Sequence, residues 1–104
     1  MGKITVVGIG PGSLEDMTPR AKRAIEEAAV VAGYTTYIKL IKDLIGEREV
    51  IGTGMMQEID RCRMAVETAA KGRDTVVVSS GDSGVYGMAG LVLELLLQRE
   101  ASDR

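Results

Sequence analysis

The chain has 104 residues, of which 45% are hydrophobic and 27% charged, a balance typical of one globular domain. Its formal net charge of −2, with three tyrosines and no Phe or Trp, argues against nucleic-acid binding, which uses basic surfaces and stacking side chains. No segment reaches the ~18 apolar residues that span a bilayer, and the first ten residues lack a signal-peptide pattern. We therefore expect a cytoplasmic protein without a membrane or nucleic-acid partner.

The side chains available for chemistry are restricted. The sequence has no histidine, the commonest general base and metal ligand, so no metal site is predicted and no catalytic residue is assigned. The single cysteine, Cys62, excludes an internal disulfide and fits a reducing compartment.

Short β-type runs alternate with longer helical patterns along the chain. In chain order, strands are predicted at 4–9, 30–32, 49–52 and 75–79, and helices at about 19–29, 36–45, 56–71 and 85–99. The first and last strand runs are almost continuously apolar, which is typical of parallel strands covered on both faces. The pattern predicts an α/β fold, an open and mainly parallel sheet with helices on both faces.

Several helix boundaries and faces carry their own signals. Thr18 is suited to cap the first helix, with Pro19 at its first position, and Gly72 is suited to end the third helix. The helix at 85–99 is so apolar that we expect it to be well buried. The third helix is expected to face the core with the apolar stripe Ile59, Cys62, Val66, Ala69 and Ala70.

Two glycine-rich turns follow the first and last predicted strands, at 8–13 (GIGPGS) and 79–84 (SSGDSG). In open α/β sheets, ligands bind beyond the carboxyl ends of the strands. The first turn departs from the dinucleotide fingerprint, because Ser13 stands where the third glycine is required and no helix follows at once. The first turn alone is equally consistent with a simple chain reversal. Asp82 taken alone fits an N-cap or turn residue better than a ligand contact. The occurrence of two such turns after strands that are expected to be neighbours in the sheet favours a ligand site.

The runs "TVVGIGPGSLEDMTPRAKRAIEEA" and "SSGDSGVYGMAGLVLEL" resemble the tetrapyrrole methylase family, which uses S-adenosylmethionine (SAM). The stretches "GYTTYIKLI" and "TGMMQEIDRCRMAVETA" are most similar to its branch of precorrin-3B or cobalt-factor III C17-methyltransferases of cobalamin biosynthesis. The resemblance implies a two-domain α/β enzyme, and the whole chain, 1–104, matches its N-terminal domain. We therefore expect a fragment or an isolated domain that lacks the C-terminal domain.

The resemblance also implies site residues and partners. SAM would lie in a cleft between the two domains, and the cofactor contacts carried over by motif are Pro11, Ser80, Gly81, Asp82 and Val85. Ser83 departs from the proline that many relatives have at that position. The acceptor would be a tetrapyrrole, methylated with ring contraction, and the full-length protein would be a homodimer. Residues that could face the acceptor, or simply pack or turn, are Gly10, Gly12, Met55, Met56 and Tyr86.

Three other functions stay open at this point. The chain could belong to a tetrapyrrole methylase that acts on another ring carbon, or to a diphthine-forming relative that acts on a protein. It could also be a non-catalytic module that binds a ligand in half a cleft. The sequence of a C-terminal half would decide between them.

Overall fold

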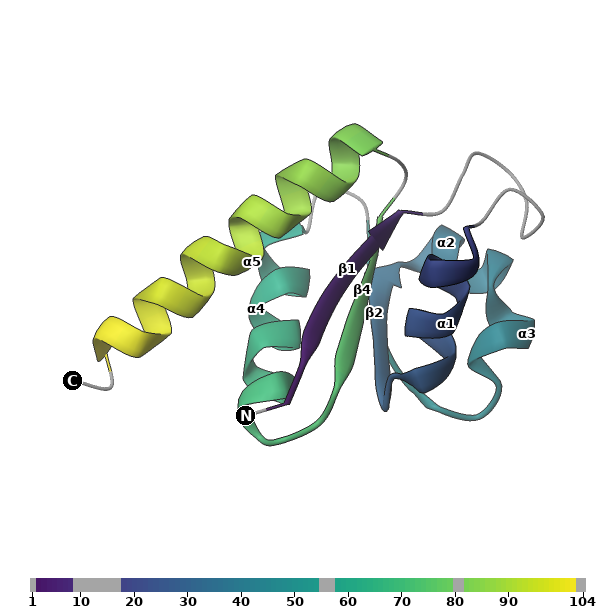
Figure 1. The fold of residues 1–104 in the computed structure, drawn as a ribbon, viewed down its shortest axis with the longest axis horizontal. Helices are drawn as coiled ribbons and strands as arrows, with labels where there is room; N and C mark the ends of the chain where they lie inside the picture. Colours follow the sequence, from purple (N-terminus) through teal and green to yellow (C-terminus); the bar gives the residue numbers. More distant parts are fainter. Residues whose placement is uncertain (1, 9–17, 55–57, 80–81, 103–104) are drawn as a thin grey trace.

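Four parallel strands form one sheet in the order β1-β4-β2-β3, and helices cover both of its faces (Figure 1). The computed structural model describes residues 2–8, 18–54, 58–79 and 82–102, and of residues 58, 82–88 and 102 only the backbone. The strands are β1 (Ile4–Gly8), β2 (Val30–Tyr34), β3 (Glu49–Thr53) and β4 (Thr75–Ser79). The helices are α1 (Pro19–Glu27), α2 (Thr35–Leu40), α3 (Lys42–Ile45), α4 (Glu58–Ala70) and α5 (Asp82–Ser102). The predicted α/β class is confirmed.

The sheet separates two hydrophobic cores, because successive side chains of a strand point to opposite faces. In β4, Val76 and Val78 pack with α1, α2 and α3, whereas Val77 packs with α4 and α5. Cys62 lies in the second core and is fully buried, as predicted for it. Apolar side chains are thus removed from water on both faces of the central strand, which explains its continuously apolar sequence.

Helix α1 begins where its sequence predicts. The hydroxyl oxygen of Thr18 accepts a hydrogen bond of 3.1 Å from the backbone N–H of Ala21, and Pro19 occupies the first helical position. Helix α4 ends before Gly72, whose φ of 93° lies in the left-handed region that favours glycine. Both boundary predictions are confirmed.

Three helix predictions have the wrong bounds. The first helix ends at Glu27 and not at 29, because Ala28 is extended with ψ 146°. The segment predicted as one helix at 36–45 forms two, because Ile41 leaves helical geometry with φ −109° and ψ 19°. The last helix starts at Asp82, three residues earlier than predicted, and reaches Ser102. Strand β2 also continues two residues beyond its predicted end, to Tyr34.

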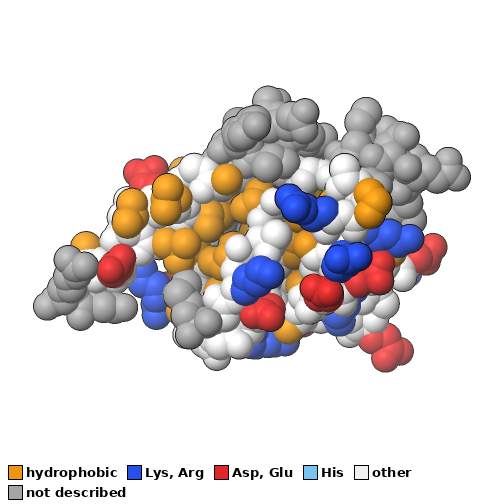
Figure 2. Space-filling view, in the orientation of Figure 1, with side chains coloured by type: hydrophobic (Ala, Val, Ile, Leu, Met, Phe, Trp, Pro, Cys, Tyr) orange, Lys and Arg blue, Asp and Glu red, His pale blue; other side chains and the backbone are white. Residues whose placement is uncertain are grey.

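The predicted faces of α4 and α5 are only partly correct. Ile59 is 55% exposed, so it does not belong to the buried stripe of α4, whereas the unpredicted Arg61 is buried. Helix α5 is not well buried: Val92 packs in the core, but Leu93 and Leu97 are each 57% exposed. Figure 2 shows apolar side chains gathered along this helix and beside the adjoining sheet. Helix α5 therefore covers the sheet with one side and leaves apolar surface on the other.

Arg48 connects two helices on the face that α1 and α3 cover. Its guanidinium donates hydrogen bonds to carbonyl oxygens near the end of α1, at Ile25 and Ala28, and near the end of α3, at Leu44 and Ile45. Carbonyls in the last turn of a helix have no partner within the helix. One cation thus satisfies the ends of two helices at once.

Candidate functional site

The four strands end at one level, which we call the carboxyl edge of the sheet. Gly8 of β1 is in register with Ser79 of β4, and Tyr34 of β2 is in register with Thr53 of β3. Between these pairs, Gly33 of β2 aligns with Val78 of β4. In parallel sheets of this kind, the crevice beyond such an edge is where ligands bind.

The two glycine-rich turns leave this edge from adjacent strands. The first follows Gly8 and the second follows Ser79, and these two residues are paired in the ladder between β1 and β4. The prediction that the two strands are neighbours is therefore confirmed. Strands next to each other in a sheet are about 4.8 Å apart, so the two segments start close together.

The predicted ligand contacts themselves fall mostly outside the described residues. This holds for Gly10, Pro11, Gly12, Met55, Met56, Ser80 and Gly81. Asp82, Val85 and Tyr86 lie in the first turns of α5, where the structure describes the backbone alone. The roles of all ten residues stay predictions, and the described strand ends locate the edge from which their segments emerge.

A hydrogen-bonded cluster lies at the β3 end of the carboxyl edge, and the sequence analysis did not find it. Arg61 Nε of α4 donates to Thr53 Oγ1 at 2.8 Å, and Arg61 Nη2 makes a longer contact of 3.5 Å with the Gly54 carbonyl. The hydroxyl of Thr35, the first residue of α2, donates to the Thr53 carbonyl at 2.8 Å. A charged residue on the buried flank of a helix was the available signal, but Ile59 fitted the apolar spacing and drew the prediction instead.

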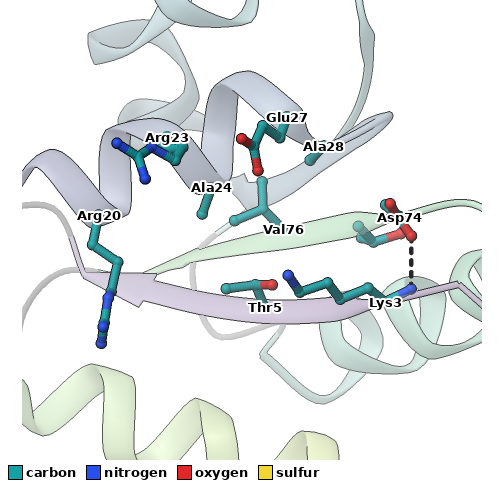
Figure 3. Close-up of a pocket in the computed structure, with 10 residues that line it drawn as sticks. Lys3, Thr5, Arg20, Arg23, Ala24, Glu27, Ala28, Asp74 and Val76 are labelled. Atoms are coloured by element: carbon teal, nitrogen blue, oxygen red, sulfur yellow. Dashed lines mark hydrogen bonds between the residues drawn. The ribbon is translucent and has the colours of Figure 1, made fainter.

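A groove of about 380 Å³ runs between α1 and β1, from Lys3 and Asp74 at the amino end of the strands to Arg20 beside the carboxyl end of β1 (Figure 3). Arg20 and Arg23 of α1 and Lys3 beside β1 contribute three positive charges, whereas Glu27 and Asp74 contribute two negative ones. The Asp74 carboxylate accepts the backbone N–H of Lys3 at 2.8 Å, which closes the groove at the amino end of the strands.

Neither a metal site nor a membrane-spanning helix is found in the part of the chain that the structure describes. Within residues 2–8, 18–54, 58–79 and 82–102, no three acidic, cysteine or histidine side chains group closely enough to hold a metal ion. Over the same ranges, none of the helices combines the length and the apolar character that crossing a membrane requires.

An all-parallel sheet from which two glycine-rich segments leave at paired strand ends defines an α/β domain of the class that binds ligands beyond its strand ends. Residues 3–102 match the family model of tetrapyrrole (corrin/porphyrin) methylases, and the chain belongs to that family. This confirms the resemblance found in the sequence.

Individual relatives agree with the family. The chain is 50% identical over 97 residues to a probable cobalt-factor III C(17)-methyltransferase of Salmonella typhimurium, covering 93% of the chain and 40% of the relative. The crystal structure of the methyltransferase CobJ superimposes with a TM-score of 0.79 at 38% identity, over 97% of the chain and 42% of CobJ. Uroporphyrin-III C-methyltransferase of Thermus thermophilus, solved with S-adenosylhomocysteine, gives a TM-score of 0.69 at 28% identity, over 95% and 44%. The chain thus spans less than half the length of each of these proteins.

Proposed function

We propose that this chain is the N-terminal domain of a SAM-dependent methyltransferase of cobalamin biosynthesis. The reaction would methylate C17 of a tetrapyrrole of the precorrin-3B or cobalt-factor III type, with ring contraction. The observation that carries the proposal is the pairing of Gly8 with Ser79, the two residues from which the glycine-rich turns start, in a member of this family. The relatives named as C17-methyltransferases support the choice of ring carbon.

The chemistry suits a site without histidine. SAM supplies an activated methyl group on a cationic sulfur, so transfer to a carbon needs chiefly alignment of donor and acceptor and exclusion of water. The proposed contacts from the first turn are Pro11, and from the second Ser80, Gly81, Asp82 and Val85. Glycines allow the backbone to approach a ligand closely, and backbone carbonyls or the Asp82 carboxylate are favourable neighbours for a positive charge.

The acceptor would lie beside the donor, along the same edge. Gly10 and Gly12 from the first turn, Met55 and Met56 after β3, and Tyr86 of α5 are the proposed residues on the acceptor side. A macrocycle is wide enough to extend from the end of β4 toward the end of β3, which lies two strands away. Such a placement gives the donor and the acceptor different parts of the carboxyl edge.

The proposal extends to assembly and location. Leu93 and Leu97 lie one helical turn apart on α5 and leave an apolar surface exposed, which supports a homodimer of the protein with both domains. The buried single cysteine supports a reducing compartment, and we propose the cytoplasm.

The test uses residues 1–104 joined to the C-terminal part of the Salmonella typhimurium relative, next to the isolated chain. We expect the joined protein to bind SAM and to transfer its methyl group to a cobalt-factor III acceptor, detected by mass spectrometry of the product. The isolated chain, with half a cleft, is expected to bind SAM weakly and to transfer nothing. SAM binding without transfer to any tetrapyrrole would instead favour a non-catalytic binding module.

A further inference from the structure

Arg61 is the one charged side chain among the buried residues of the described part of the chain. Its side chain belongs to α4, and the residue is only 5% exposed. Removing a guanidinium from water is costly unless its donors are paired with good acceptors. The neighbouring positions of α4, Cys62 and Ala65, fill the core with apolar atoms, so packing alone does not call for a cation here.

The contacts of Arg61 are concentrated on one point of the backbone, the exit of β3. Nε donates to Thr53 Oγ1 at 2.8 Å, and Nη2 contacts the Gly54 carbonyl. Thr53 is held from its other side as well, because its carbonyl accepts the Thr35 hydroxyl at 2.8 Å. Hydrogen bonds from a charged donor are about twice as strong as those between neutral groups. The last residue of β3 is therefore fixed between α4 and the start of α2.

This point lies on the carboxyl edge, at a distance from the two glycine-rich turns. With strands spaced about 4.8 Å apart, the end of β3 is about 10 Å from the end of β4 and about 14 Å from the end of β1. The proposed donor contacts follow β1 and β4, and none of them belongs to the Thr53–Gly54 exit. The proposed acceptor extends toward the end of β3, where the described residues are Thr53 and Gly54.

We propose that Arg61 is a positioning residue that holds the Thr53–Gly54 exit of β3 as the acceptor-side wall of the cleft. This inference rests on the proposed methyltransferase function and adds a role to it. Arg61 acts through Thr53 and Gly54 and does not itself touch the substrate, because its side chain is buried. The acceptor site thus depends on a cation that the donor site does not need.

The test compares variants of the joined protein described above. Arg61→Met removes all hydrogen-bond donors of the side chain and fills the site with an unbranched apolar side chain. Arg61→Lys keeps the positive charge but changes the geometry of the donors. Thr53→Val removes the accepting oxygen at constant shape. Arg63→Met is the matched control, since Arg63 lies on the same helix with a side chain that is 61% exposed.

We expect Arg61→Met to raise the KM for the tetrapyrrole about tenfold and to leave the Kd for SAM unchanged. A tenfold change corresponds to the free energy of about one charge-assisted hydrogen bond. Thr53→Val should have a similar effect, Arg61→Lys a smaller one, and Arg63→Met none. Because both partners serve one contact, Arg61→Met combined with Thr53→Val should be no worse than Arg61→Met alone.

Other outcomes would overturn the proposal. If Arg61→Met lowers the affinity for SAM, the affinity for the tetrapyrrole and the Tm together, Arg61 stabilises the fold and has no specific role at the acceptor site. If the KM for the tetrapyrrole does not change, Arg61 has no positioning role. If Arg61→Met does not fold, Arg61→Lys and Thr53→Val decide by the same constants. The unsubstituted protein reports on the methyltransferase function by itself: if it transfers no methyl group, that function fails and the positioning role with it, whatever the variants do.

Discussion

Asp82 is the residue whose proposed role is most directly electrostatic. It opens α5 at the end of the second glycine-rich turn, three residues after Ser79 at the carboxyl edge. A carboxylate at that position can serve the cationic sulfur of SAM, or it can serve the start of the helix, where a negative charge is favourable. Replacing the charge without changing the shape distinguishes the two roles.

We expect Asp82→Asn in the joined protein to weaken SAM binding about tenfold, an electrostatic contribution of about 1.4 kcal/mol. S-adenosylhomocysteine should lose much less affinity. Its sulfur is neutral, so it gains no charge–charge attraction from the Asp82 carboxylate that the variant could remove. Isothermal titration calorimetry measures both constants, and Asp43→Asn on the exposed side of α3 is the control. Equal losses for the two ligands, or no loss, would assign Asp82 to the helix instead.

Arg48 presents a purely structural use of the same kind of side chain as Arg61. We expect Arg48→Met to lower the free energy of unfolding by about 2 kcal/mol, because the carbonyls that end α1 and α3 lose a charged donor. Urea denaturation of the 104-residue chain measures the change, with Lys42→Met on the exposed surface of α3 as the control. Ligand constants of the joined protein should not change. A loss no larger than that of the control would contradict this role.

At the scale of whole elements, α5 contains a glycine that its geometry does not require. Gly90 lies within the helix, and a Cβ built on it would meet no atom within 4 Å. Gly90→Ala is therefore expected to raise the free energy of unfolding by about 0.5–1 kcal/mol, since alanine restricts the unfolded chain and favours the helix.

The matched comparison for Gly90→Ala is Gly72→Ala, at the positive φ that follows α4. This change should lower stability, because a side chain is strained in that conformation. Thermal unfolding of the two variants should therefore shift in opposite directions. A loss of stability in Gly90→Ala would mean that the helix surface around it is occupied in solution.

Strands β1 and β4 were predictable because their apolar runs are almost continuous and end in turn residues. The start of α1 was predictable because Thr18 and Pro19 form a local signal that does not depend on the rest of the fold. The break at Ile41 was not predictable, since nothing in "TTYIKLIKDLI" interrupts the helical spacing, and tertiary packing decides the geometry there.

The candidate site was also predictable only in part. The glycine-rich turns and the neighbouring positions of β1 and β4 follow from local sequence and from the rules for parallel sheets. The burial of Arg61 does not, because it depends on Thr53, eight residues away, lying beside the flank of α4. Hydrophobic spacing favoured Ile59, and only the placement of α4 against β3 shows that the cation is the buried residue.

For the molecule as a whole, the exposed face of α5 has a testable use. In the joined protein, replacing both Leu93 and Leu97 with glutamine is expected to convert the proposed homodimer into a monomer, as measured by light scattering after gel filtration. Both side chains are 57% exposed, so the stability of the 104-residue chain should change by no more than about 0.5 kcal/mol per substitution. Glu94→Gln on the same helix is the control, and a dimer that persists in the double variant would place the interface elsewhere.

The strand order has a further consequence for how the molecule reaches this state. Only β2 and β3 are neighbours both in sequence and in the described sheet, whereas β1 pairs with the last strand, β4. The hydrogen bond between Lys3 and Asp74 accordingly joins residues 71 positions apart. Closing so long a loop has to precede the pairing that repays it, which slows folding. During synthesis on the ribosome, the first strand therefore emerges as an unpaired apolar segment, and the nascent chain can complete its sheet only after the fourth strand has left the exit tunnel.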